Sequence, residues 1–151
     1  MIKIICIGKI KEKYLREAIE DYVKRIKKYT NFEIIELKDE NDQDIKKAIK
    51  VEGENILKYV NTKDYIITLE VKGEQLSSEK FAEKITKINI DYSNICFIIG
   101  GSNGLSEDVL KKKKFSLSFS KMTFPHQLFR VILLEQIYRA YKIKNNETYH
   151  K

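Results

Sequence analysis

The sequence predicts an α/β protein with a five-to-six-stranded, mostly parallel sheet that has helices on both faces. Short runs of apolar, β-branched residues alternate along the chain with longer segments whose apolar residues recur at helical spacing. Each connecting segment is long enough for a crossover helix, which is the connection that parallel strands need. The chain of 151 residues shows no internal repeat and no change of composition. Residues 1–151 are therefore expected to form a single domain.

The predicted strands are short and strongly apolar. The first, IKIICIG, is β-branched and ends in glycine, and NICFIIG is the most apolar of the set. Both read as strands that are buried on two faces. A turn is expected at Gly73, after the third strand. The strands are predicted at Ile2–Gly8, Phe32–Leu37, Asp64–Val71, Asn94–Gly100 and Phe115–Ser120.

The first four helices are predicted between these strands. Glu12–Tyr29 carries a single apolar stripe. Asp42–Tyr59 begins with acidic residues, which suit the positive end of a helix dipole. Ser77 or Ser78 is expected to cap a third helix that runs to about Ile88, and Ser106 to cap a short fourth one.

The last helix is predicted to begin at Pro125, the only proline, because a proline in the first turn loses no intrahelical hydrogen bond. Its apolar residues cover most of its circumference. One side can pack on the sheet, and a second copy of the chain is the simplest cover for the other. Glu135 and Arg139 lie four residues apart and can pair. Arg130, near the helix start, could reach a phosphate or a carboxylate.

Composition narrows the classes of function. A formal net charge of +7 favours polyanionic partners such as RNA, DNA or a membrane surface. No apolar run reaches the ~20 residues of a bilayer-spanning helix, and the N-terminus lacks the features of a signal peptide, so a cytoplasmic protein is expected. Cys6 and Cys96 lie in apolar strands with no nearby ligand partner, which predicts buried thiols rather than a metal site.

Ligands of parallel sheets bind beyond the carboxyl ends of the strands, so the functional loops are expected after Leu69, after Gly100 and after Ser120. The segment FIIGGSNGLSEDVL combines glycines with a capped helix but matches neither a dinucleotide fingerprint nor a P-loop. It is either a tight strand–helix turn or a backbone wall for a nucleoside-like ligand. His126 follows Pro125 at a helix start, where the dipole favours a neutral imidazole.

Two other readings fit parts of the sequence. A non-catalytic RNA- or ribosome-binding protein would explain the basic charge but not the glycine loop. A flavodoxin-like nucleotide or phosphate binder would need a glycine- and hydroxyl-rich loop early in the chain, where only Gly8 is present. Basic clusters that could contact phosphates, or be simply solvated, are Lys9, Lys11 and Lys13; Lys24, Arg25, Lys27 and Lys28; and Lys111–Lys114.

The chain resembles the RlmH family of SPOUT-class RNA methyltransferases over nearly its whole length. The resemblance rests on ICIGKIKEKY, ITLEVKGEQLSSEKFA, FIIGGSNGLSEDVL, LSFSKMTFPHQLFRVILLEQIYRAYKI and the closing YHK. Two departures are Glu74, where many members have a basic residue, and Thr148, which is often proline. Neither lies in the loops that are expected to bind the ligand.

This resemblance implies a homodimer with a trefoil knot in the C-terminal half, and S-adenosyl-L-methionine as methyl donor. The implied product is N3-methylpseudouridine in helix 69 of 23S rRNA, made on the assembled ribosome. No metal is implied. By motif, the cofactor contacts fall on Leu69 and Gly100 and on the loop residues Phe119, Ser120, Lys121, Met122, Thr123 and Phe124.

The base that removes the proton from N3 is not fixed by the resemblance. His126 is the first candidate, and Tyr149 and His150 from the partner's C-terminal tail come next. In that arrangement the tail closes over the other subunit's cofactor loop and makes a composite site. Arg130 and the lysine clusters are expected to hold RNA phosphates.

Overall fold

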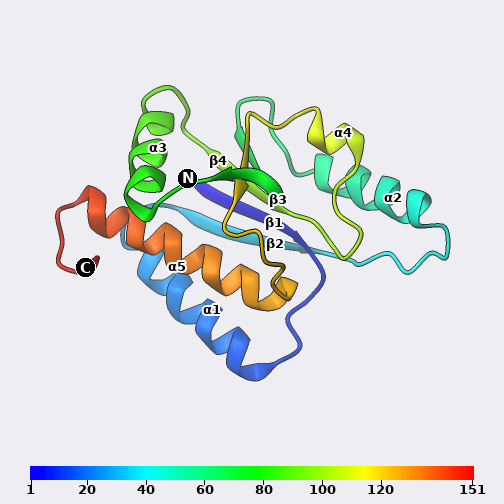
Figure 1. Ribbon diagram of the computed structural model, residues 1–151, viewed down its shortest axis with the longest axis horizontal. Coiled ribbons are helices and arrows are strands. Elements are labelled where there is room, and N and C mark those ends of the chain that lie inside the picture. Colours follow the sequence, from blue (N-terminus) through cyan, green and yellow to red (C-terminus); the bar gives the residue numbers. More distant parts are fainter.

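The structure is a computed structural model that describes residues 1–151, and its centre is a five-stranded, fully parallel sheet with the order β2-β1-β4-β3-β5 (Figure 1). This confirms the predicted α/β class and the parallel pairing. The strands are β1 (Ile2–Ile7), β2 (Phe32–Leu37), β3 (Tyr65–Gln75), β4 (Ile95–Ile99) and β5 (Phe115–Ser118). The helices are α1 (Lys13–Ile26), α2 (Ile45–Leu57), α3 (Ser78–Asp91), α4 (Glu107–Leu110) and α5 (His126–Lys144).

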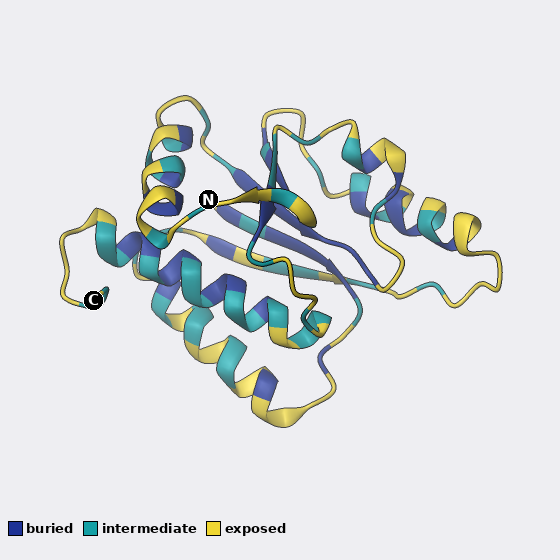
Figure 2. Ribbon diagram, viewed as in Figure 1, coloured by how far each residue is buried: buried dark blue, intermediate teal, exposed yellow.

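Helices cover both faces of the sheet, as predicted. The larger core lies under α1, α3 and α5, and a smaller core lies under α2 and α4. Alternate residues of the central strands supply the two cores: Ile4 faces the larger and Ile5 the smaller, and Phe97 and Ile98 divide in the same way. Figure 2 shows the central strands as the most deeply buried part of the chain. The sheet is thus buried on both sides, which explains the unbroken apolar runs in its sequence.

Side-chain caps fix the starts of three helices. Ser77 accepts a hydrogen bond from the Lys80 N–H, and Ser106 accepts one from Val109, as expected. Asp44 caps α2, so this helix begins at Ile45 rather than at Asp42. Inside α2, a Cβ on Gly53 would lie 2.1 Å from Ser106 Oγ. Helix α2 and the start of α4 therefore pack so closely at this point that there is no room for a side chain on residue 53.

The third strand differs from its prediction at Gly73. No turn forms there, because β3 continues to Gln75. Its pairing with β5 shifts between Leu69 and Glu74, which both pair with Leu117. The residues between them therefore bulge out of the ladder. Gly73 lies against β5: a Cβ on it would be 2.8 Å from the Ser116 carbonyl group and the Leu117 backbone. The glycine serves this close approach, which the sequence pattern does not distinguish from a turn.

Helix α5 finds most of its apolar partners within the same chain. It packs against α1 and α3 and contributes Leu133, Ile137 and Tyr138 to the larger core. Helices of the same chain therefore cover much of the side for which another copy of the chain was expected, and the homodimer stays a prediction. What remains open lies near its start, where Leu128 is 41% exposed. No helix of the structure combines the length and the apolar character that a bilayer crossing needs.

Both cysteines are predicted to resist alkylation in the folded protein. Cys6 and Cys96 are free and fully buried, and burial raises the pKa of each thiol to about 12. The reactive thiolate is therefore scarce at pH 8, and no reagent reaches it. Iodoacetamide should modify neither residue in the native state and both after denaturation in guanidinium chloride, as measured by intact mass. Rapid modification of the native protein would contradict this packing.

Candidate active site

The bulge of β3 and the loops at the carboxyl ends of β4 and β5 line a cavity of about 420 Å³. The parallel-sheet rule selects these three segments from the sequence, but the loop expected after Leu69 is a bulge within β3, because this strand continues to Gln75. The volume of the cavity lies within the ~300–1,000 Å³ usual for small-molecule sites. The loop segments that line the cavity are Leu69–Lys72, Ile99–Ser102 with Gly104 and Leu105, and Leu117–Ser120 with Met122, Thr123 and Phe124; Leu110, His126 and Phe129 complete the lining.

The loop after β4 presents the backbone of three glycines to the cavity, together with Ser102 and Leu105. Gly104 donates its N–H to the Gly101 carbonyl over 3.1 Å and adopts a positive φ of 85°. A Cβ on Gly100 would lie 3.0 Å from the Gly104 backbone. The loop therefore needs glycine both for its conformation and for its close folding. This favours the reading of the segment as a backbone wall for a ligand.

The loop after β5 is held by its own serines and by aromatic packing. Ser118 donates to the Ser120 carbonyl over 3.1 Å, and the Met122 N–H donates to Ser120 Oγ over 3.0 Å. The rings of Phe119 and Phe124 lie 5.1 and 6.2 Å from that of Phe129 on α5. The cavity thus has an apolar wall on this side. Of the six predicted cofactor contacts in this loop, only Lys121 is absent from the lining.

Leu69 and His126 also line the cavity, although they lie far apart in the sequence. Leu69 is the last residue of β3 before the bulge, and His126 is the first residue of α5. The structure thus brings Leu69, Gly100, His126 and the loop after β5 to one place, as the sequence predicts.

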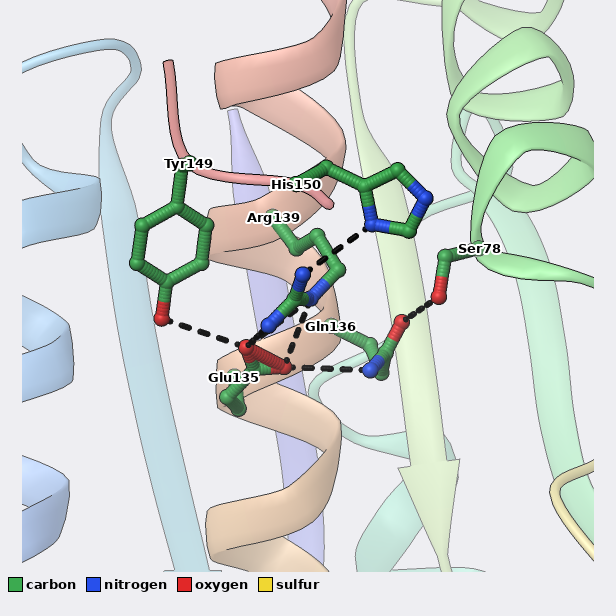
Figure 3. A network of polar contacts seen from close by, with 6 residues as sticks. All are labelled: Ser78, Glu135, Gln136, Arg139, Tyr149 and His150. Carbon is green, nitrogen blue, oxygen red and sulfur yellow. Dashed lines mark hydrogen bonds and ion pairs between the residues drawn. The ribbon is translucent and has the colours of Figure 1, made fainter.

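The C-terminal tail lies elsewhere, folded back on its own chain (Figure 3). The Tyr149 hydroxyl donates to Glu135 over 3.2 Å, and Arg139 Nη1 lies 3.0 Å from His150 Nδ1. His150 Nε2 lies 2.6 Å from a Glu79 carboxylate oxygen on α3. Arg139 also makes the predicted ion pair with Glu135, at 2.7 Å. Neither Tyr149 nor His150 lines the cavity of its own chain.

A second cavity, of about 280 Å³, adjoins the first. It shares Leu117, Phe119 and Phe124 with the first cavity, and it is also lined by Ser78 and Gln136. Ser78 donates to the Gln136 side chain, whose amide in turn donates to Glu135. Hydrogen bonds therefore link two residues of this lining to the network that holds the tail, although no tail residue lines the cavity itself.

Arg130 is the predicted site residue that the structure places differently. It is 2% exposed, and its guanidinium donates to Glu36 over 2.6 Å and to the Gly8 carbonyl over 3.1 Å. Its guanidinium is therefore engaged inside the protein, and no accessible group supports the predicted phosphate contact. These hydrogen bonds tie the start of α5 to the ends of β1 and β2.

Glu36→Gln is expected to destabilise the protein. The change removes the charge that neutralises a buried guanidinium. Because the Glu36 side chain is itself 38% exposed, the expected loss is about 2 kcal/mol rather than the ~3–5 kcal/mol of a fully buried pair. Urea denaturation measures it, with the exposed Glu33→Gln on the same strand as control. Equal stabilities for the two variants would refute the assigned role of Arg130.

Two further groups were not predicted from the sequence. Glu70 lines the cavity and accepts hydrogen bonds from Thr68, Ser116 and Lys113. Glu52, 5% exposed, accepts the Glu40 N–H over 3.0 Å, and burial beside other carboxylates raises its pKa. The position of Glu70 directly after Leu69 is the signal that could have identified it. No group of three or more His, Cys, Asp or Glu is arranged to hold a metal ion.

Comparisons with known proteins agree on one family. A family model described as "Predicted SPOUT methyltransferase" matches residues 1–150. The chain is 52% identical over 157 aligned residues to the ribosomal RNA large subunit methyltransferase H of Clostridium botulinum (strain Alaska E43 / Type E3), with 99% of each chain covered. It is 48% identical over 159 residues to the protein of the same name from Clostridium kluyveri (strain ATCC 8527), again with 99% of each covered.

A solved structure of a probable methylase family protein from Haemophilus influenzae Rd KW20 has a similar fold, with a TM-score of 0.57 at 14% identity, over 99% of this chain and 70% of that one. At this identity the likeness concerns the fold alone. The family model and the close relatives cover the chain almost end to end. The chain therefore belongs to the RlmH family of SPOUT methyltransferases.

Proposed function

We propose that the chain transfers a methyl group from S-adenosyl-L-methionine to N3 of a pseudouridine in helix 69 of 23S rRNA, on the assembled ribosome. The observation that carries the proposal is the meeting of three loops, predicted separately, around one cavity. The names of the close relatives, which specify large-subunit ribosomal RNA, support the class of substrate. Residues 1–151 would act as one domain, and a ribosomal substrate implies the cytoplasm.

The lining of the cavity fits this cofactor. Leu69, Leu105 and the phenylalanines offer apolar surface to a purine, and the Gly100–Gly104 backbone offers hydrogen-bonding groups without side chains in the way. Glu70 is a carboxylate that can face a cationic ligand. The cofactor would be held by Leu69, Gly100 and the loop Phe119–Phe124. Within this loop, Lys121 does not line the cavity, so its contact would be made at the cavity's edge.

When bound, S-adenosyl-L-methionine supplies a methyl group on a positively charged sulfur, which a nucleophile attacks in line. The chain's task is then to align the acceptor and to exclude water. The apolar wall of Phe119, Phe124 and Phe129 serves the second purpose. N3 of pseudouridine must lose a proton, and His126, at the cavity and at a helix start, is placed to take it.

We place Tyr149 and His150 in the site of the partner subunit of a homodimer. Neither residue lines the cavity of its own chain, so a partner's tail is the one that could complete the site. Exposed apolar residues also lie at the first cavity: Val71, 52% exposed, and Met122, 76% exposed, belong to its lining. Leu128, 41% exposed, lies near the start of α5 between the lining residues His126 and Phe129. A second chain would cover these exposed residues. The trefoil knot belongs to the same proposal, and it rests on the resemblance to the SPOUT family.

Lysines that follow β1 would bind RNA phosphates in place of Arg130. Lys9 and Lys11 are exposed in a loop at the carboxyl edge of the sheet, which is also the edge of the cavity. Neutralised phosphates release counterions, so binding should weaken steeply with salt.

The test is methylation of ribosomes that lack the modification, using S-adenosyl-L-methionine with a labelled methyl group. Label is expected in 23S rRNA, on one pseudouridine of helix 69, with assembled ribosomes preferred over free rRNA. Calorimetry with the cofactor alone separates the rival class: an RNA-binding protein without catalysis would give no saturable heat. Label at another nucleotide would disprove the proposed site of methylation while leaving the reaction class intact.

A further inference from the structure

Glu70 is the only acidic residue that lines the cavity. It lies in the bulge of β3, immediately after Leu69, and its side chain is 26% exposed. Lys72 in the same bulge is the only lysine of the lining, and His126 is the only other titratable side chain there. The charge of the cavity lining therefore depends on very few side chains, and Glu70 is the only one that carries a negative charge.

Three donors converge on one oxygen of this carboxylate. Glu70 Oε2 accepts from Thr68 Oγ1 at 2.7 Å, from Lys113 Nζ at 2.9 Å and from the Ser116 hydroxyl. Oε1 accepts no hydrogen bond within the chain, and it is not among the buried atoms without a partner, so it remains accessible. One oxygen anchors the side chain, and the other is left for a ligand.

The carboxylate is held in its charged form. Burial alone would raise the pKa of Glu70, but the hydrogen bonds from Ser116, Thr68 and Lys113 outweigh it, and the net shift is downward. A network that preserves a negative charge beside a ligand cavity favours a cationic ligand.

We propose that Glu70 sets the charge selectivity of the cofactor cavity, favouring the sulfonium methyl donor over the neutral thioether that remains after transfer. This inference rests on the proposed function and deepens it. In the transfer, the methyl carbon–sulfur bond breaks, its electron pair stays on sulfur, and a bond from the methyl carbon to N3 forms as the N3 proton passes to the base. Donor and product thus differ by one methyl group and one positive charge, and they share every other atom.

Lys113 opposes this effect. Its ammonium group neutralises part of the Glu70 charge from a side chain that is 33% exposed. Removing Glu70 and removing Lys113 should therefore change the preference for the donor in opposite directions. A purely structural role for the pair predicts no such opposition, because either loss would loosen the same bulge.

The experiment measures dissociation constants of purified wild-type and variant proteins for S-adenosyl-L-methionine and for S-adenosyl-L-homocysteine by calorimetry. The quantity compared is the ratio of the product's constant to the donor's. In Glu70→Gln this ratio should fall by about tenfold, the size expected for losing one charge interaction at short range in a partly exposed site. In Lys113→Gln the ratio should rise by roughly threefold. The expected rise is small because the Lys113–Glu70 ion pair is partly exposed, and solvent weakens its charge interaction.

Glu74→Gln is the matched control, because Glu74 is an exposed carboxylate of the same strand outside the cavity lining, and its ratio should match the wild type. Thermal unfolding checks that each variant is folded. Equal losses of affinity for both ligands in Glu70→Gln, or the same direction of change in both variants, would overturn the inference. A wild-type protein that binds neither ligand would instead overturn the proposed function itself.

Discussion

Gly73→Ala is expected to destabilise the protein by about 3 kcal/mol, the upper end of the usual cost of forcing one extra carbon into a packed site. The added Cβ would lie 2.8 Å from backbone atoms of Ser116 and Leu117, and backbone cannot move aside as a flexible side chain can. For a chain of this length the loss corresponds to a fall of roughly 10 °C in Tm. Because Gly73 does not have a positive φ, the effect tests steric contact alone.

Glu74→Ala is the control for this experiment. Glu74 is exposed on the same strand, and its side chain can be shortened without loss of packing, so its Tm should lie within about 2 °C of the wild type. Gly73→Ala should also weaken binding of the methyl donor, since Gly73 is the last residue of the bulge that carries Glu70 and Lys72 to the cavity. A Tm for Gly73→Ala that matches the control would mean that β3 does not approach β5 as closely as described.

Deletion of residues 146–151 is expected to reduce methyl transfer by at least a hundredfold while the fold and donor binding persist. Helix α5 ends at Lys144, before the deletion, and none of the deleted residues lines the cavity. The tail's own contacts are hydrogen bonds and ion pairs with partly exposed groups and the packing of Tyr149 on the buried Tyr138, with ring centroids 4.9 Å apart. Their loss should lower the free energy of unfolding by only ~1–2 kcal/mol.

The double variant Tyr149→Phe with His150→Gln separates chemistry from packing, because it keeps the size of the tail. It should also lose transfer, with donor affinity unchanged. Mixing the truncated protein with an inactive cavity variant provides a further check: a composite site would recover partial activity in mixed dimers. Normal turnover by the truncated protein would refute the placement of the tail in the partner's site.

Local sequence signals identified most of the fold and the location of the site. Serines at the starts of α3 and α4 and the proline before α5 mark helix boundaries through chemistry within a few residues of each boundary. The glycine-rich loop after β4 was identifiable for the same reason. The edge where the cavity forms followed from parallel strands, whose carboxyl ends share one side of the sheet.

Long-range contacts account for what the sequence did not reveal. From the sequence, Arg130 is expected to be a free cation near a helix start. In the structure it is buried and paired with Glu36, which lies 94 residues away in the sequence. The sequence pattern predicts a turn at Gly73. The glycine is in fact needed for its close contact with β5, a strand that lies about 40 residues further along the chain. The apolar circumference of α5 was interpreted as needing a second copy, whereas α1 and α3 supply most of its cover. Each of these depends on which segments meet, and periodicity carries no information about that.

The central claim is that the bulge of β3 and the loops after β4 and β5 together enclose the methyl donor. The most direct test is a crystal structure of the protein with S-adenosyl-L-methionine bound. The account predicts the donor in the cavity, in contact with Leu69, Gly100 and the loop Phe119–Phe124, with a partner's tail beside it. Donor bound at any other place on the chain, with these three segments empty, would contradict it.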